Sequence, residues 1–268
     1  MGRIITGLIL AVGWLLLLFL GSYPLFCLVI TACGGVAFYE FFRMSLPASE
    51  NKHFVSVLIV GILPLLGTTA WGFSGLTTSL FLALLLLIIL TITAYPTLDN
   101  GLAFVCRQGF GIFYIGFCSA HLILLYSLPD GIFWLLMLSA ITVFSDTAAY
   151  YTGSKLGKTK LYPALSPGKT REGALGGVIG GVIGGVVVAA IAFENVNLPL
   201  VGLLCLVLSV IGIIGDLIES LIKRVSGVKD SGGFLPGHGG LLDRCDSILL
   251  TAPALYHALF WWQAALLR

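Results

Sequence analysis

Long apolar stretches dominate the chain, and short polar or turn-forming segments separate them. A helix needs roughly 20 apolar residues to cross the hydrocarbon core of a bilayer, and these stretches are about that long. Most of the breaks hold turn residues, such as Tyr95-Pro96 and Pro129-Asp130-Gly131. The pattern predicts nine membrane-spanning helices, at about residues 4–20, 25–42, 54–73, 78–95, 109–127, 132–152, 173–193, 199–222 and 245–266.

The composition agrees with an all-α fold, a polytopic integral membrane helix bundle in a lipid bilayer. Of the 268 residues, 58% are hydrophobic and 10% are charged, whereas soluble domains are about 25% charged. A net charge of only +2 argues against a nucleic acid as the main partner. The six cysteines include no CxxC pair, so we expect small core residues rather than disulfides or a zinc site.

Basic residues are distributed unevenly between the predicted loops. If the N-terminus is cytoplasmic, 13 of the 14 Lys and Arg residues fall in cytoplasmic segments, and only Arg268 lies outside. This asymmetry follows the positive-inside rule, so we expect the N-terminus inside and the C-terminus outside. Two long polar connections, 153–172 and 223–244, then emerge together on the cytoplasmic face. We expect residues 1–140 to form a scaffold and residues 141–268 to form the catalytic membrane region.

Glycines recur in the seventh predicted span. Gly176, Gly180 and Gly184 stand at four-residue spacing, and each is followed by a second glycine. Such a face lets another helix backbone approach closely. The pattern predicts either a tight joint within the bundle or the seam of a homodimer.

Charged residues enter the eighth span in the stretch "GDLIESLIKR", residues 215–224. Asp216, Glu219, Ser220 and Lys223 are spaced so that they share one helix face. A carboxylate within a bilayer costs about 2.5–3.5 kcal/mol unless it faces a wet cavity or a cation. An interfacial salt bridge, with Lys223 neutralising Asp216 or Glu219, is the structural alternative.

The stretch "KDSGGFLPGHGGLLDRCD", residues 229–246, gathers glycines, charges and His238 in one loop. We expect the last helix to begin near Leu241, with Asp243 and Asp246 at its N-terminal end. The helix dipole alone favours carboxylates there. Carboxylates from two helix ends with basic residues around them are also what a Mg²⁺–polyphosphate site requires.

The other polar connection carries a second basic cluster. Asp146 and Tyr150 share a face at the end of the sixth span, and Ser166–Thr170 is predicted to form a turn that exposes Lys169. Such a stretch is commonly just a basic cytoplasmic loop. Because both loops are expected on the same membrane face, we predict a joint anionic site.

The run from Ser220 to Asp246 resembles the signature of the phosphatidate cytidylyltransferases, also called CDP-diacylglycerol synthases. The upstream "SPGKTREG" is similar to a second stretch of that family, and Cys245 departs conservatively from its usual residue. The matching signature positions are Ser220, Lys223, Arg224, Lys229, Asp230, Gly232, Leu235, Pro236, His238, Gly239, Gly240, Asp243, Arg244 and Asp246.

The resemblance implies a nucleotidyltransferase that makes CDP-diacylglycerol and pyrophosphate from CTP and phosphatidate in the bacterial cytoplasmic membrane. It implies a requirement for Mg²⁺, with Asp216 and Asp246 as the main ligands and Asp243 beside them; the family is also described with K⁺ near the divalent ion. Lys223 and His238 join Asp216 and Asp246 as the expected catalytic residues. The expected substrate-binding residues are Ser166, Lys169, Arg171, Ser220, Arg224, Lys229, Asp230 and Arg244.

Other functions agree less well with the pattern. CTP-dependent lipid-alcohol kinases and synthases of archaeal ether lipids also pair membrane helices with cytidine nucleotides. CDP-alcohol phosphotransferases carry a doubled Asp motif that is missing here. A transporter would place polar groups near mid-membrane and show repeat symmetry, whereas here the polar residues gather at one face.

Overall fold

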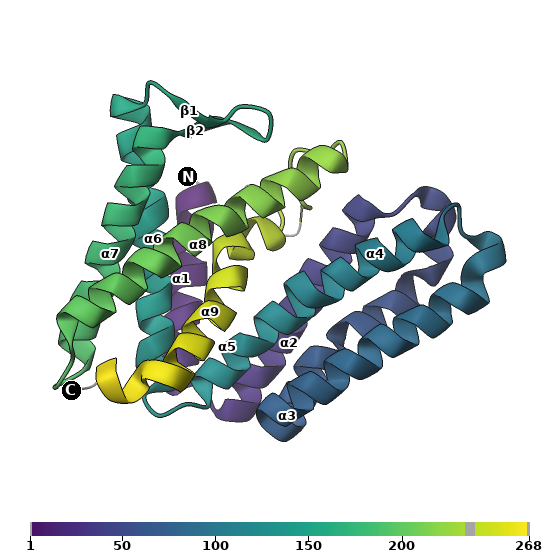
Figure 1. Ribbon diagram of the computed structural model, residues 1–268, viewed down its shortest axis with the longest axis horizontal. Coiled ribbons are helices and arrows are strands. Elements are labelled where there is room, and N and C mark those ends of the chain that lie inside the picture. The colour runs from purple at the N-terminus through teal and green to yellow at the C-terminus, as the bar shows by residue number, and fades with distance from the viewer. Residues whose placement is uncertain (1, 234–238, 267–268) are drawn as a thin grey trace. The chain divides into compact units, whose positions relative to one another are not determined.

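The computed structural model describes residues 2–233 and 239–266, and it consists mainly of helices (Figure 1). Within these residues, six helices are long and apolar enough to cross a membrane. The chain is therefore an all-α integral membrane protein, as predicted. The elements are α1 (Gly2–Leu20), α2 (Tyr23–Ser45), the short helix Ala48–His53, α3 (Phe54–Ala94), the short helix Tyr95–Thr97, α4 (Gly101–Gly111), the π-helical segment Ile112–Phe117, α5 (Cys118–Tyr126), α6 (Gly131–Leu156), β1 (Lys160–Tyr162), β2 (Ser166–Thr170), α7 (Arg171–Ala192), α8 (Leu198–Val225) and α9 (Leu242–Leu266).

Helix α3 covers two of the predicted spans, 54–73 and 78–95, and it is interrupted near its middle. The backbone dihedrals of Trp71 and Gly72 are not helical, and Gly72 has a φ of 59°, which favours glycine. A Cβ on Gly75 would collide with the carbonyl oxygen of Gly67. Residues eight apart are about 12 Å apart along a straight helix, so the chain reverses here into a helical hairpin. The number of membrane crossings stays a prediction.

The chain divides into two compact units, and each is described by itself. The first unit comprises Met1–Leu124 and Val225–Arg244, and the second comprises Leu125–Arg224 and Cys245–Arg268. In the first unit, α2 packs against α3 and α4 through aromatic side chains. Phe42 is fully buried, and its ring lies 5.1 Å from that of Phe54 in an edge-to-face arrangement. The predicted division at residue 140 stays a prediction.

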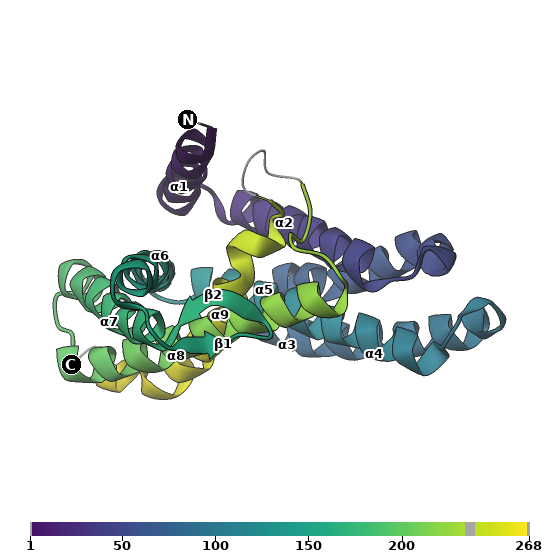
Figure 2. The same cartoon turned by 90° about the horizontal axis from the view of Figure 1, so that it is seen from above.

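In the second unit, α6 and α7 lie side by side along most of their length (Figures 1 and 2). The glycines of α7 make this approach possible. A Cβ on Gly180 would collide with Ala148 and would stand 2.7 Å from the carbonyl oxygen of Phe144. Gly181 lies against Ser209 of α8 in the same way. The predicted tight joint within the bundle is therefore confirmed.

A small antiparallel hairpin, β1 and β2, connects α6 to α7, with Lys160 opposite Thr170. The expected turn at residues 166–170 is wrong, because these residues form β2 itself. Thr170 ends the strand as the N-cap of α7, and its hydroxyl accepts a hydrogen bond from the backbone N–H of Gly173 at 3.0 Å. Glu172 accepts hydrogen bonds from the backbone N–H groups of Lys158 and Thr159. The hairpin is thus tied to the first turn of α7, which fixes where β2 ends.

Candidate active site

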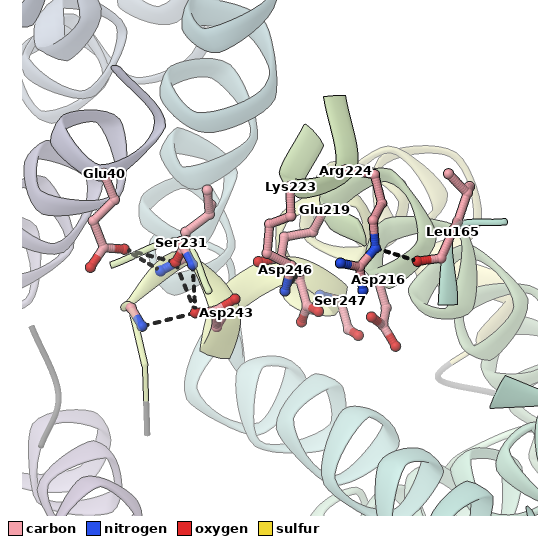
Figure 3. A network of polar contacts seen from close by, with 12 residues as sticks. Glu40, Leu165, Asp216, Glu219, Lys223, Arg224, Ser231, Asp243, Asp246 and Ser247 are labelled. Carbon is pink, nitrogen blue, oxygen red and sulfur yellow. Dashed lines mark hydrogen bonds and ion pairs between the residues drawn. The ribbon is translucent and has the colours of Figure 1, made fainter. Parts of the chain in front are cut away.

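Three carboxylates from α8 and α9 lie close together in the second unit. One oxygen each from Asp216, Glu219 and Asp246 lies within 4.8 Å of the other two, and Figure 3 shows these side chains beside one another. The helices approach closely here because Gly215 of α8 lies against the backbone of Asp246. The structure brings together both predicted main metal ligands. It adds Glu219, which was predicted to share the helix face of Asp216 and to be a possible salt-bridge partner of Lys223, but not to be a metal ligand.

Two lysines neutralise two of these carboxylates. Lys169 of β2 forms an ion pair with Asp216, and Lys223 forms an ion pair with Glu219, four residues earlier on α8. The side chain of Glu219 is only 1% exposed. A buried carboxylate is costly unless it is paired, which explains why Lys223 lies against it. Lys169 comes from one of the two polar connections that were expected to form a joint site, whereas Asp216 lies on α8, before the second connection.

The arrangement of charges fits a divalent cation. No Lys or Arg of the described residues forms an ion pair with Asp246. The three carboxylates of the cluster therefore share two lysine partners among the described residues. Carboxylate oxygens are the ligands that Mg²⁺ prefers, and Mg²⁺ sites usually use one or two carboxylates together with phosphate groups of the substrate. Asp216, Glu219 and Asp246 thus form a donor set suited to Mg²⁺.

A cavity of about 530 Å³ adjoins the carboxylates. Its lining includes the polar residues Asp146, Lys169, Asp216 and Ser247 and apolar residues such as Leu208. Pockets of this kind, mainly apolar with a few convergent polar groups, are typical of ligand sites. Asp146 was noted in the sequence only for sharing a helix face with Tyr150. The fold brings both residues to this cavity.

The remaining predicted site residues of the second unit lie on β2, at the start of α7 and on α8. Ser166 begins β2, and the exposed side chain of Arg171 stands at the start of α7. Ser220 is buried on α8. Arg224 donates a hydrogen bond from Nε to the carbonyl oxygen of Leu165, at 3.0 Å (Figure 3). The guanidinium of Arg224 therefore links the end of α8 to the β1–β2 connection.

Comparison with known proteins identifies the chain. The model of the cytidylyltransferase family matches residues 1–262. The chain belongs to this family. A phosphatidate cytidylyltransferase of Bacillus subtilis (strain 168) is 34% identical over 263 residues, which cover 96% of this chain and 96% of that protein.

Further phosphatidate cytidylyltransferases match about half of the chain with higher identity. That of Staphylococcus haemolyticus is 44% identical over 126 residues, or 47% of this chain and 48% of that protein. That of Brucella suis is 43% identical over 147 residues, or 54% of each. The predicted resemblance to this family is confirmed.

The remaining predicted site residues of this cytidylyltransferase lie in the first unit. Lys229, Asp230 and Arg244 are exposed there. The Oδ2 atom of Asp243 accepts hydrogen bonds from the backbone N–H groups of Ser231 and Gly240, so this carboxylate orders the loop. Its assignment as a metal ligand stays a prediction. His238 lies outside the described residues.

Sequence reasoning missed one acidic residue in this cytidylyltransferase. Glu40 of α2 is 3% exposed and accepts hydrogen bonds from the same loop that Asp243 orders (Figure 3). Its signal in the sequence was a single acidic residue inside the apolar run "VAFYEFFRM". Its partners lie about 200 positions later in the chain, so local spacing gave no indication of them.

Proposed function

We propose that this cytidylyltransferase transfers CMP from CTP to phosphatidate and so produces CDP-diacylglycerol and pyrophosphate for phospholipid biosynthesis. The observation that carries the proposal is the cluster of Asp216, Glu219 and Asp246, with its two lysines, beside a cavity in a membrane protein. The Bacillus subtilis relative, which matches nearly the whole chain, carries the name of this activity.

The reaction needs no covalent intermediate on the protein. A phosphate oxygen of phosphatidate attacks the α-phosphorus of CTP, the bond from that phosphorus to the bridging oxygen breaks, and pyrophosphate leaves with the bonding electron pair. Both reactants are anions, so the site must offset their charge and align them. Lys169 and Lys223 supply positive charge beside the carboxylates, and Arg224 supplies a third positive group at the end of α8.

Asp216, Glu219 and Asp246 would hold the Mg²⁺ ion, since they are the described carboxylates whose oxygens converge. When bound, Mg²⁺ offsets negative charge on the phosphates of CTP and of the leaving pyrophosphate. Lys169 and Lys223 form ion pairs with two of the three carboxylates. A second, monovalent ion such as K⁺ stays a prediction.

The mixed lining of the cavity suits a substrate with a charged head and apolar chains. Asp216 and Lys169 are among its polar lining residues, and Leu208 is among its apolar ones. We propose that Asp216 and Lys169 face the cytoplasmic side of the bacterial inner membrane, where CTP is available from water, with the N-terminus inside and the C-terminus outside. This orientation rests on the distribution of Lys and Arg. A homodimer stays a prediction.

The test uses the purified full chain with Mg²⁺, phosphatidate and CTP labelled at either the α- or the γ-phosphate. The proposal expects the α-label in the lipid product and the γ-label in pyrophosphate. A lipid-alcohol kinase would instead move the γ-label to a lipid and would require a polyprenol or diacylglycerol acceptor. Absence of labelled lipid from α-labelled CTP, with phosphatidate present, would overturn the proposal.

A metal arm of the same assay tests the carboxylate cluster. Chelation of divalent ions with EDTA is expected to stop product formation, and added Mg²⁺ is expected to restore it. Full activity after chelation and dialysis would refute a divalent ion at Asp216, Glu219 and Asp246.

A further inference from the structure

Glu40 holds the loop that precedes α9, although it lies on α2 and far away in sequence. Its Oε1 accepts a hydrogen bond from the backbone N–H of Leu241 at 3.0 Å. Its Oε2 accepts hydrogen bonds from the backbone N–H of Leu242 at 2.9 Å and from the hydroxyl of Ser231 at 3.3 Å. The side chain is 3% exposed. A buried carboxylate is tolerated when it is hydrogen-bonded in this way, and here the loop supplies the donors.

These donors lie at a helix end that requires an acceptor. The first N–H groups of a helix have no partner within the helix, and Leu242 is the first residue of α9. An acidic group at that end also interacts favourably with the helix dipole. Glu40 therefore caps α9 from another helix. Asp246 lies one turn further along α9.

The loop is shaped closely around this carboxylate. A Cβ on Gly232 would stand 2.6 Å from Oε1 of Glu40, and a Cβ on Gly240 would stand 2.6 Å from Oε2. The hydroxyl of Ser231 lies 3.0 Å from Oδ2 of Asp243, which also accepts the N–H of Gly240 at 2.8 Å. Two carboxylates thus fix the start and the end of the same loop (Figure 3).

We propose that Glu40 is a positioning residue of the transferase: it holds the described loop residues around Ser231 and at Gly240–Leu242 in the arrangement that binds CTP. The inference rests on the proposed function, because Lys229 and Asp230 of this loop are the expected substrate contacts. Glu40 itself touches the loop backbone and Ser231. Its effect on catalysis passes through the order of the loop.

Glu40→Gln tests this role without changing the volume of the side chain. The amide keeps one acceptor oxygen and turns its NH₂ group toward a backbone N–H, so at least one hydrogen bond is replaced by a donor facing a donor. Ordering of the loop then becomes an equilibrium that precedes the binding of CTP. If one tenth of the molecules hold the loop ordered, the apparent KM for CTP rises about tenfold, while saturating CTP restores the ordered state.

Glu50→Gln is the matched control. Glu50 is also in the first unit and fully buried, and it pairs with Arg107 at 3.1 Å. Its hydrogen-bond and ion-pair partner is thus outside the loop. A variant that only lowers the amount of folded protein reduces the maximal rate and leaves KM unchanged. We expect that behaviour from Glu50→Gln.

A second readout follows loop order without any assay of activity. Cys245 lies in the first turns of α9 and is half-buried. Its alkylation by a maleimide, measured peptide by peptide with mass spectrometry, is expected to be at least about fivefold faster in Glu40→Gln than in wild type or Glu50→Gln. Ser231→Ala removes a single hydroxyl and is expected to shift both readouts in the same direction by a smaller factor. It serves as the test if Glu40→Gln does not fold.

The inference is supported if KM for CTP rises at least about tenfold, kcat changes less than about threefold and alkylation of Cys245 accelerates. Unchanged KM overturns it, whatever happens to kcat, and so does an unchanged alkylation rate. If the wild-type chain makes no CDP-diacylglycerol, the proposed function fails. The alkylation arm then decides alone whether Glu40 orders the loop.

Discussion

Gly215 of α8 lies against Asp246 of α9 so closely that a Cβ on the glycine would stand 2.6 Å from the carbonyl oxygen of the aspartate. The two helices that carry the carboxylate cluster meet at this point. Gly215→Ala is expected to push them apart, at a cost of about 1–3 kcal/mol for overpacking. Because Asp216 follows directly, we expect the rate of CDP-diacylglycerol formation to fall at least about tenfold.

Gly202→Ala is the control on the same helix, since its Cβ would meet only Val186, at 3.8 Å. Initial rates of the two purified variants, normalised to folded protein, make the comparison. Equal activity of the two variants would refute a close approach at Gly215.

Loss of the charge at Asp246 should remove activity. Asp246→Asn keeps the side-chain volume but takes away a carboxylate of the cluster, so product formation is expected to fall at least about 100-fold. The amount of protein extracted in detergent should be normal, and Asp216→Asn should behave alike. Asp130→Asn is the control, because Asp130 has a φ of 57°, a conformation that asparagine tolerates well. Full activity of Asp246→Asn would contradict its assignment to the cluster.

Lys169 is expected to be needed for its charge. Lys169→Met keeps most of the length of the side chain but removes the ammonium group and leaves Asp216 without its ion pair, so the rate should fall roughly 10–100-fold. Lys160→Met, on the exposed side of β1, should retain most of the activity. Rates measured over a range of CTP concentrations check the prediction. Equal losses of activity in both variants would show that Lys169 contributes only as a general surface charge.

The joint between α6 and α7 should limit stability rather than chemistry. Gly180→Ala places a methyl group against Ala148 and the carbonyl oxygen of Phe144, and it should lower the free energy of unfolding by about 1–3 kcal/mol. Gly35→Ala on α2 has room, with its nearest neighbour Ile62 at 3.8 Å, and should not destabilise. Thermal unfolding in detergent distinguishes them; an unchanged midpoint in Gly180→Ala would contradict the tight joint.

Local spacing in the sequence predicted what lies within one helix. The face of Asp216, Glu219 and Lys223 follows from the period of the α-helix, and the pair between Lys223 and Glu219 was among the alternatives considered. The glycine spacing of α7 likewise predicted close packing, because it needs only a smooth helix face.

Contacts between distant segments were not predictable in this way. The pairing of Lys169 with Asp216 depends on where β2 ends, and a three-residue strand such as β1 is too short to show alternation. Two of the three partners of Glu40 are backbone N–H groups, which every residue except proline possesses. No residue type in the loop therefore marked these two in advance.

The hydrogen-bond partners of Glu40 are synthesised long after Glu40 itself. Ser231 is 191 positions later in the chain and Leu242 is 202 positions later. At 5–20 residues per second, the ribosome needs about 10–40 s to make that length. During this interval the glutamate of α2 has no native donor, so the first unit is completed only when the chain returns to it after α8. A product truncated before residue 231 lacks Asp243 and Asp246 of α9. In such a product Glu40 on α2 also lacks the hydrogen-bond donors Ser231, Leu241 and Leu242.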